Sequence, residues 1–288
     1  MVLENTEVNI KNATIESSVY AGGNGQTAIV MGDTLLNIEG TSQITNHVFG
    51  GGNAAATGCA QDIEDISGNV IAICTNPSNS SSEVNIAGAT IGGNVYGGAN
   101  TSVLYGVTTV NIGNDTIDSK YNLTKGNITI NGTVFGGGEA NAAGSEDYDY
   151  SFISVTKGIN INIDANGHNT YLINGSIFGS GNASSSGGYS YINIKNYGDS
   201  TNYKSNISIQ RTDIVTLDNS AIKLSGATDR TNKYKSELFT FSRIGELKLK
   251  NNSTVYLEKG ANLLESISSL KDQNNSEVYE TVTINENN

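Results

Sequence analysis

The chain has 288 residues and carries 16 basic against 28 acidic side chains, which gives a formal net charge of −12. No basic stripe is present to contact phosphates, so the composition argues against a nucleic-acid partner. No apolar run reaches about 18 residues, so no membrane span is expected. Glycine (34) and asparagine (39) are abundant, yet Val and Ile recur at alternate positions. The sequence can therefore still build a hydrophobic core.

The first recurring element is an aliphatic–Asn–aliphatic triplet, the pattern of a half-buried strand. If the aliphatic side chains point inward, the six asparagines form an outward row of amides that hydrogen-bond one another. The same row is also a candidate sugar-binding strip. The triplets begin at Val8, Leu36, Val84, Val110, Ile161 and Ile192, and the asparagines are Asn9, Asn37, Asn85, Asn111, Asn162 and Asn193.

The second recurring element is a Val/Ile–aromatic–glycine motif, found in five copies with an aliphatic residue four positions before each. Its glycines are expected to form tight corners with positive φ, and the following Asn to tolerate the left-handed region. Strict alternation would aim the aromatic side chains outward as a strip that stacks on sugar rings, whereas the Phe residues favour burial. The sequence therefore allows both an exposed and a buried aromatic row. The aromatic residues are Tyr20, Phe49, Tyr96, Phe135 and Phe178.

The two motifs alternate with a period of about 26–31 residues, lengthened in places by inserted loops. Three short strands per repeat are expected: the triplet, the segment ending at Val–Tyr/Phe, and a segment such as residues 27–30. Short strands with Gly and Asn at the corners predict an all-β parallel β-helix (β-solenoid) of roughly nine or ten coils. This number is for the whole chain, and we assign the Gly/Asn-rich coils to residues 1–200.

The insertions at about 54–82, 113–127 and 139–157 break the repeat. The first holds Cys59 and Cys74, which are expected to form a disulfide if the protein is exported. The third contains Asp147, Tyr148, Asp149 and Tyr150. That cluster is either a solvated loop or a surface for calcium or a protein partner, although its spacing does not match an EF-hand.

Residues 201–288 keep the period of two without the Gly-Gly motif. They predict further, less typical coils and a short capping segment near 261–270. Catalysis is not expected, because His47 and His168 are the only histidines and neither lies beside a nucleophile motif. No metal site or cofactor is expected.

The repeat Val84-Asn85-Ile86…Ile91-Gly92-Gly93-Asn94-Val95-Tyr96-Gly97-Gly98-Ala99-Asn100 resembles those of large surface proteins of Gram-positive bacteria. Such regions are similar to the right-handed parallel β-helix of pectate-lyase-like folds and adhesins. The resemblance implies an extracellular, cell-surface or cell-wall adhesin segment that binds a glycan or host protein. We expect a monomeric piece of a longer chain. A passive stalk is the alternative, and a polysaccharide lyase or hydrolase is a second one, because one fold hosts many functions.

Overall fold

The computed structural model of the protein is all-β and dominated by long parallel sheets. It describes residues 1–139, 153–168, 171–182, 185–198, 209–210, 212–224, 244–257 and 270–271. One helix, α1 (Asp115–Tyr121), occurs in these ranges. No helix of the described part is long and apolar enough to cross a membrane.

Every Val-Asn-Ile-type triplet lies in a nine-stranded sheet whose strand order follows the chain order. All neighbouring strands of this sheet are parallel. Its strands are β1 (Thr6–Lys11), β4 (Thr34–Glu39), β9 (Ser80–Ile86), β12 (Gly106–Ile112), β16 (Gly158–Asp164), β20 (Ser190–Lys195), β22 (Thr212–Asp218), β24 (Ile244–Lys250) and β26 (Leu270–Lys271). The last three continue the sheet into the C-terminal part.

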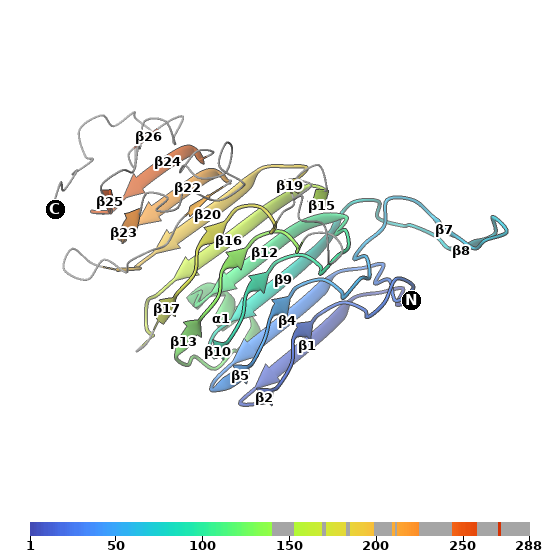
Figure 1. The fold of residues 1–288 in the computed structure, drawn as a ribbon, viewed down its shortest axis with the longest axis horizontal. Coiled ribbons are helices and arrows are strands. Elements are labelled where there is room, and N and C mark those ends of the chain that lie inside the picture. Colours follow the sequence, from blue (N-terminus) through green and yellow to red (C-terminus); the bar gives the residue numbers. More distant parts are fainter. Residues whose placement is uncertain are drawn as a thin grey trace, which may run out of the picture.

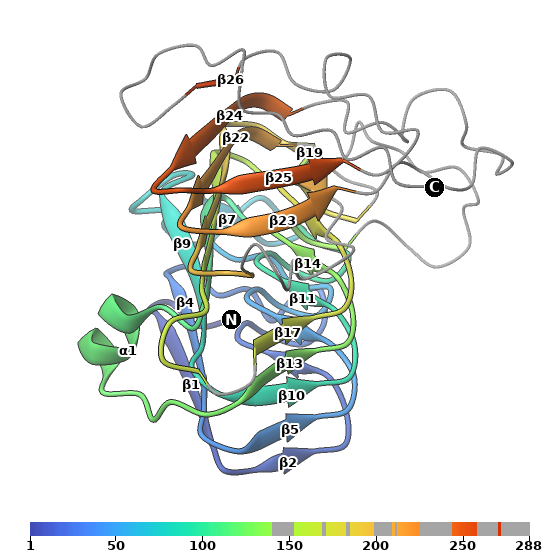
Figure 2. The ribbon, with the colours of Figure 1, turned by 90° about the vertical axis from the view of Figure 1, so that its left-hand side faces the viewer.

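Two further parallel sheets collect the short strands of each repeat (Figures 1 and 2). The five-stranded sheet contains β2 (Thr14–Ile15), β5 (Ser42–Ile44), β10 (Ala89–Ile91), β13 (Ile128–Ile130) and β17 (Tyr171–Ile173). The six-stranded sheet contains β3 (Val19–Tyr20), β6 (Val48–Phe49), β11 (Val95–Tyr96), β14 (Val134–Phe135), β18 (Ile177–Phe178) and β21 (Ile209–Gln210). Between β1 and β20 the chain therefore visits the three sheets in the same order in every repeat.

Three pairs of strands lie outside these sheets. β7 (Ile63–Glu64) and β8 (Val70–Ala72) form an antiparallel hairpin. β15 (Ile153–Val155) pairs with β19 (Ser185–Ser186), and β23 (Ala221–Leu224) pairs with β25 (Thr254–Leu257), both parallel.

The core runs along the space enclosed by the three sheets. Its aliphatic side chains come from the triplets, from the residue that precedes each motif by four positions, and from the Val or Ile of the motif, and together they form one buried cluster. Alternation explains this arrangement, because the first and third residues of a triplet share one face of the strand. The expected inward facing of the triplets is confirmed.

The prediction that a segment such as residues 27–30 forms the third strand of each repeat is wrong. The segment from the lead-in aliphatic residue to the aromatic residue forms two strands, one in each smaller sheet. Residues 27–30 form no strand, and Val30 makes only isolated bridges, to Val2 and Thr57. Three residues separate the two strands in each of the five repeats, for example Gly92-Gly93-Asn94 between β10 and β11, and sequence spacing alone did not mark that corner.

The role expected for the motif glycines is also wrong. None of the glycines at 50–52, 97–98 and 136–138 has a positive φ. Glycine is needed at these positions because the backbones of neighbouring repeats lie too close together for a side chain. A Cβ on Gly50 would lie 2.3 Å from the Gly97 carbonyl oxygen, and a Cβ on Gly97 would lie 2.3 Å from the Gly136 carbonyl oxygen. The left-handed conformation falls instead on the residues after the motif Asn, Ala54 (φ 55°) and Thr101 (φ 51°).

Candidate functional site

The five aromatic side chains of the motif form one continuous stack. Ring centroids of successive members lie 4.8, 4.6, 4.9 and 5.1 Å apart, and the interplanar angles are 17° or less. Phe49, Tyr96 and Phe135 are buried, while Tyr20 and Phe178 at the two ends are partly buried. The stack is therefore a second packed row, separate from the main core, and its middle presents no open ring face to a sugar.

Polar groups close the edge of the stack at Tyr96. The Tyr96 hydroxyl accepts a hydrogen bond from Asn94 Nδ2 (2.9 Å) and donates one to Glu139 Oε1 (3.3 Å). His47 packs edge-on against both Phe49 and Tyr96. Burial raises the pKa of Tyr96, and the nearby Glu139 charge raises it further. Tyr96 therefore stays neutral and donates this hydrogen bond. The expectation from strict alternation, that the rings are exposed, is wrong for Phe49, Tyr96 and Phe135 at the centre of the row.

The six triplet asparagines form the amide row that the sequence predicts. From Asn37 onward, each Nδ2 donates to the Oδ1 of the equivalent residue one repeat earlier, over 2.8–3.0 Å. At the first position, Asn9 Nδ2 donates to Glu7 Oε1 (2.8 Å). The strand register aligns these residues in turn, so the row follows directly from parallel pairing of identical triplets.

The insertion at 113–127 covers the middle of this amide row. It contains α1, whose N-cap Asn114 accepts hydrogen bonds from Thr116 N and Ile117 N, and which ends at the left-handed Asn122. The Tyr121 hydroxyl donates to Glu83 Oε2 (3.0 Å), and Thr124 N donates to Glu39 Oε2 (2.5 Å). Figure 2 shows α1 outside the nine-stranded sheet.

These two anchors flank the row, since Glu39 follows Asn37 by two residues on β4 and Glu83 precedes Asn85 by two on β9. The insertion therefore crosses the row, and Asn37, Asn85 and Asn111 are buried. Burial raises the pKa of Glu39, but the hydrogen bonds from Thr124 and Lys11 outweigh it, and the net pKa lies below the ordinary value. Glu39 is thus an ionised anchor at neutral pH.

The insertion leaves the amide row open at both ends, at Asn9 on β1 and on β16 and β20. Asn193 is exposed and Asn162 is half-buried. Tyr191 lies on the same face of β20 as Asn193, two residues earlier, and 36% of its surface is exposed. Across the sheet, Tyr191 is in register with Asn160 on β16 and with Ile214 on β22. We call this surface the open strip, and define it as Asn160, Asn162, Tyr191 and Asn193.

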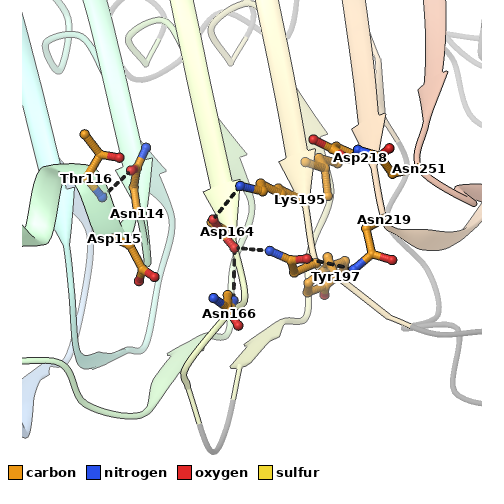
Figure 3. A network of polar contacts seen from close by, with 12 residues as sticks. Asn114, Asp115, Thr116, Asp164, Asn166, Lys195, Tyr197, Asp218, Asn219 and Asn251 are labelled. Carbon is orange, nitrogen blue, oxygen red and sulfur yellow. Dashed lines mark hydrogen bonds and ion pairs between the residues drawn. The ribbon is translucent and has the colours of Figure 1, made fainter. Parts of the chain in front are cut away.

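A row of alternating charge borders the open strip at the ends of the strands (Figure 3). Asp164, Lys195 and Asp218 are in register on three successive strands. Lys250 continues this register on β24. Lys195 Nζ lies 3.9 Å from Asp164 Oδ2. Asn196 Nδ2 donates to Asp164 Oδ1 (2.9 Å), and Asn219 Nδ2 donates to Asn196 Oδ1 (2.8 Å). The border is therefore close to neutral, which suits an uncharged ligand.

A buried carboxylate, Asp118, lies on α1, and the charge of the half-buried His168 acts on it. Asp118 is buried, and neither its Oδ2 nor Nε2 of His168 has a hydrogen-bond partner. His168 Nδ1 is 2.8 Å from the Gly126 carbonyl oxygen. Burial raises the pKa of Asp118 to about 6, although the charges of His168 and Lys125 act in the opposite direction.

The remaining predicted residues lie apart from the open strip. Cys59 and Cys74 form a disulfide at the base of the β7–β8 hairpin. Asp147, Tyr148, Asp149 and Tyr150 and the predicted capping segment lie outside the described residues. In the described part of the chain, no group of three or more His, Cys, Asp or Glu side chains is placed to hold a metal ion.

Sequence reasoning missed Tyr191 and α1. Tyr191 precedes the Ile192-Asn193-Ile194 triplet, so alternation already placed it beside Asn193. For α1 the signal was Asn114 as an N-cap followed by the acidic Asp115. Comparison of the chain with family models, curated proteins and solved structures finds no match.

Proposed function

We propose that the protein is a segment of a right-handed parallel β-helix of roughly nine or ten coils, belonging to an extracellular, cell-surface protein of the adhesin type. The support is the strand order of the nine-stranded sheet, which repeats the chain order with parallel register throughout. A chain that contributes one strand to each of three sheets per repeat produces this order when it winds in one direction.

The protein binds a glycan at the open strip, and we expect no cleavage of that glycan. The observation that carries this proposal is the exposed ring of Tyr191 beside the exposed amide of Asn193. The ring face stacks on the C–H face of a sugar, while amide groups both donate to and accept from hydroxyls. The four side chains are held on adjacent strands, so little ordering is needed on binding.

Residues away from the strip provide a matched control. Asn174 is an exposed amide that, like Asn193, donates to the equivalent Asn of an earlier repeat, here Asn131 (2.9 Å). It follows β17 of the five-stranded sheet and so lies far from Tyr191 in the topology.

The test is a glycan array with the purified protein, followed by calorimetry with the strongest ligand. We expect Tyr191→Ala and Asn193→Ala to weaken binding at least tenfold, about 1.4 kcal/mol each. Asn174→Ala should bind like the unmodified protein. Ligand recovered after long incubation should be intact. Equal binding by Tyr191→Ala and the unmodified protein would refute the site.

A passive stalk is the second candidate. The observation that favours it is the pair of continuous rows, the aromatic stack and the amide row, because the middle residues of both are buried. If the folded protein binds no glycan on a broad array, the stalk is favoured over the adhesin.

A further inference from the structure

The Cys59–Cys74 hairpin, defined here as residues 59–74, is built differently from the rest of the molecule. It extends away from the three sheets, as the β7–β8 segment in Figure 1 shows. Its base is anchored in a small core of its own, where the buried Cys59, Cys74, Ala72 and Met31 pack together. Asp62 Oδ1 accepts a hydrogen bond from Cys74 N (2.7 Å). The hairpin therefore projects from a fixed root.

The tip of the hairpin is held in one conformation by Asp65. Its carboxylate accepts hydrogen bonds from Ser67 N (2.8 Å), Asn69 N (2.9 Å) and Asn69 Nδ2 (3.0 Å). These bonds, led by the Asn69 side chain, keep the pKa of Asp65 below its ordinary value. Gly68 supplies the left-handed residue of the turn (φ 79°). The tip is therefore shaped before any partner arrives, which lowers the entropic cost of binding.

Apolar side chains cover this rigid projection. Ile66 at the tip is fully exposed, and Val70, Ile71 and Ile73 expose 51, 55 and 70% of their surface. Single exposed aliphatic residues are ordinary, but four within eight residues on one projecting element are a local concentration of exposed apolar surface, which is typical of an interaction site. Ala72 is the residue of β8 that does not contribute to this surface, because it packs into the hairpin's own core.

The charges of the hairpin identify the kind of partner. Asp62, Glu64 and Asp65 are its only ionisable side chains besides the bonded cysteines, and all three are acidic. An anionic lipid surface would repel them. A second copy of this hairpin would bring like charges together as well. An apolar groove rimmed by Lys and Arg matches both the isoleucines and the carboxylates.

We propose that the Cys59–Cys74 hairpin is a preformed binding element for a partner protein. It inserts Ile66 and its aliphatic neighbours into an apolar groove of that partner, and basic residues lie at the rim of the groove. This site is independent of the open strip, and neither experiment shares a variant with the other.

The probe is a displayed library of a small three-helix domain with randomised surface positions, selected against the full chain. We expect the enriched domains to combine apolar and Lys/Arg residues, and to compete with one another for one site. Ile66→Ser with Ile71→Ser should reduce their affinity at least tenfold, and Glu64→Lys should also weaken it. Leu172→Ser, which removes an exposed apolar residue from β17, is the control and should bind normally.

The disulfide supplies a second variant that keeps the isoleucines. Cys59→Ser with Cys74→Ser should weaken binding severalfold, because the root of the hairpin is then free to move. Circular dichroism of each variant should match that of the unmodified protein, since the hairpin lies outside the three sheets.

Several results would overturn the proposal. Selected domains that bind the Ile66→Ser, Ile71→Ser variant at full strength would place the preferred site elsewhere, and enrichment of acidic domains would contradict the charge argument. Sedimentation of the protein with phosphatidylcholine vesicles that contain phosphatidylserine would make the occupant a lipid surface. Self-association lost in the same variant would make it a second copy.

Discussion

The covered part of the amide row gives a quantitative test of what holds the repeats in register. Asn85 is buried on β9; its Nδ2 donates to Asn37 Oδ1 (2.9 Å), and its Oδ1 accepts from Asn111 Nδ2 (2.8 Å). Replacing Asn85 by alanine removes both bonds at once. Water does not reach the two partners easily, because the insertion that contains α1 lies over them.

The expected cost follows from the partners left behind. A buried donor or acceptor without a partner costs about 1–3 kcal/mol. Asn37 Oδ1 loses its donor outright, whereas Asn111 Nδ2 keeps a weak alternative, Glu83 Oε1 at 3.5 Å. We therefore expect Asn85→Ala to lower the free energy of unfolding by about 2–4 kcal/mol, in the lower part of the combined range.

The measurement is urea unfolding followed by circular dichroism, with Asn193→Ala as the control. Asn193 donates one equivalent bond (3.0 Å) but is exposed, so water replaces that bond and the loss should stay below about 1 kcal/mol. The slopes of the transitions should be equal, which shows that the same surface unfolds in both variants. Equal losses of unfolding free energy for the two variants would refute the argument that burial makes these hydrogen bonds important for stability.

Two further predictions concern packing and pH. Phe49→Ala removes a buried ring stacked on both sides and should cost about 3–5 kcal/mol in thermal or urea unfolding; Tyr20→Ala, at the half-exposed end of the stack, should cost clearly less, and equal costs would contradict a continuous stack. Burial raises the pKa of Asp118 from 3.8 to about 6, so the folded state binds the proton more tightly and the ionised form is penalised. Stability contributed by protonated Asp118 is present below pH 4 and is lost as the pH rises to about 6. Asp118→Asn should therefore gain stability relative to the unmodified protein over that window, and a difference that does not change with pH would count against this assignment.

Much of the fold could be predicted because the residues that specify it repeat. In Val84-Asn85-Ile86 the alternation alone gave the inward aliphatic side chains and the outward amide. The facing of Phe49 could not be settled in this way, because alternation and residue type pointed in opposite directions. In the structure Phe49 does alternate away from Val48, yet neighbouring rings and His47 bury it.

The open strip depended on information that no local pattern holds. Whether Asn111 or Asn193 meets solvent depends on the insertion that follows β12, which crosses back over earlier repeats to reach Glu83 and Glu39. That contact spans 85 residues of sequence in the case of Thr124 and Glu39. The exposed face of the row is thus decided by tertiary folding of an inserted segment.

The amide row also has a direction. In each amide pair of the row, the later repeat donates and the earlier one accepts, so all five bonds run in the same direction. An aspartate, which ionised has no donor, can therefore fill only the accepting role. In the neighbouring row at the ends of the strands, Asp164 and Asp218 do so, accepting from Asn196 and Asn251. Loss of a single amide nitrogen in the interior, by deamidation, would then break the bond toward the preceding repeat and spare the one from the following repeat. Deamidation of such a row therefore weakens the contact with one neighbouring repeat and not with the other.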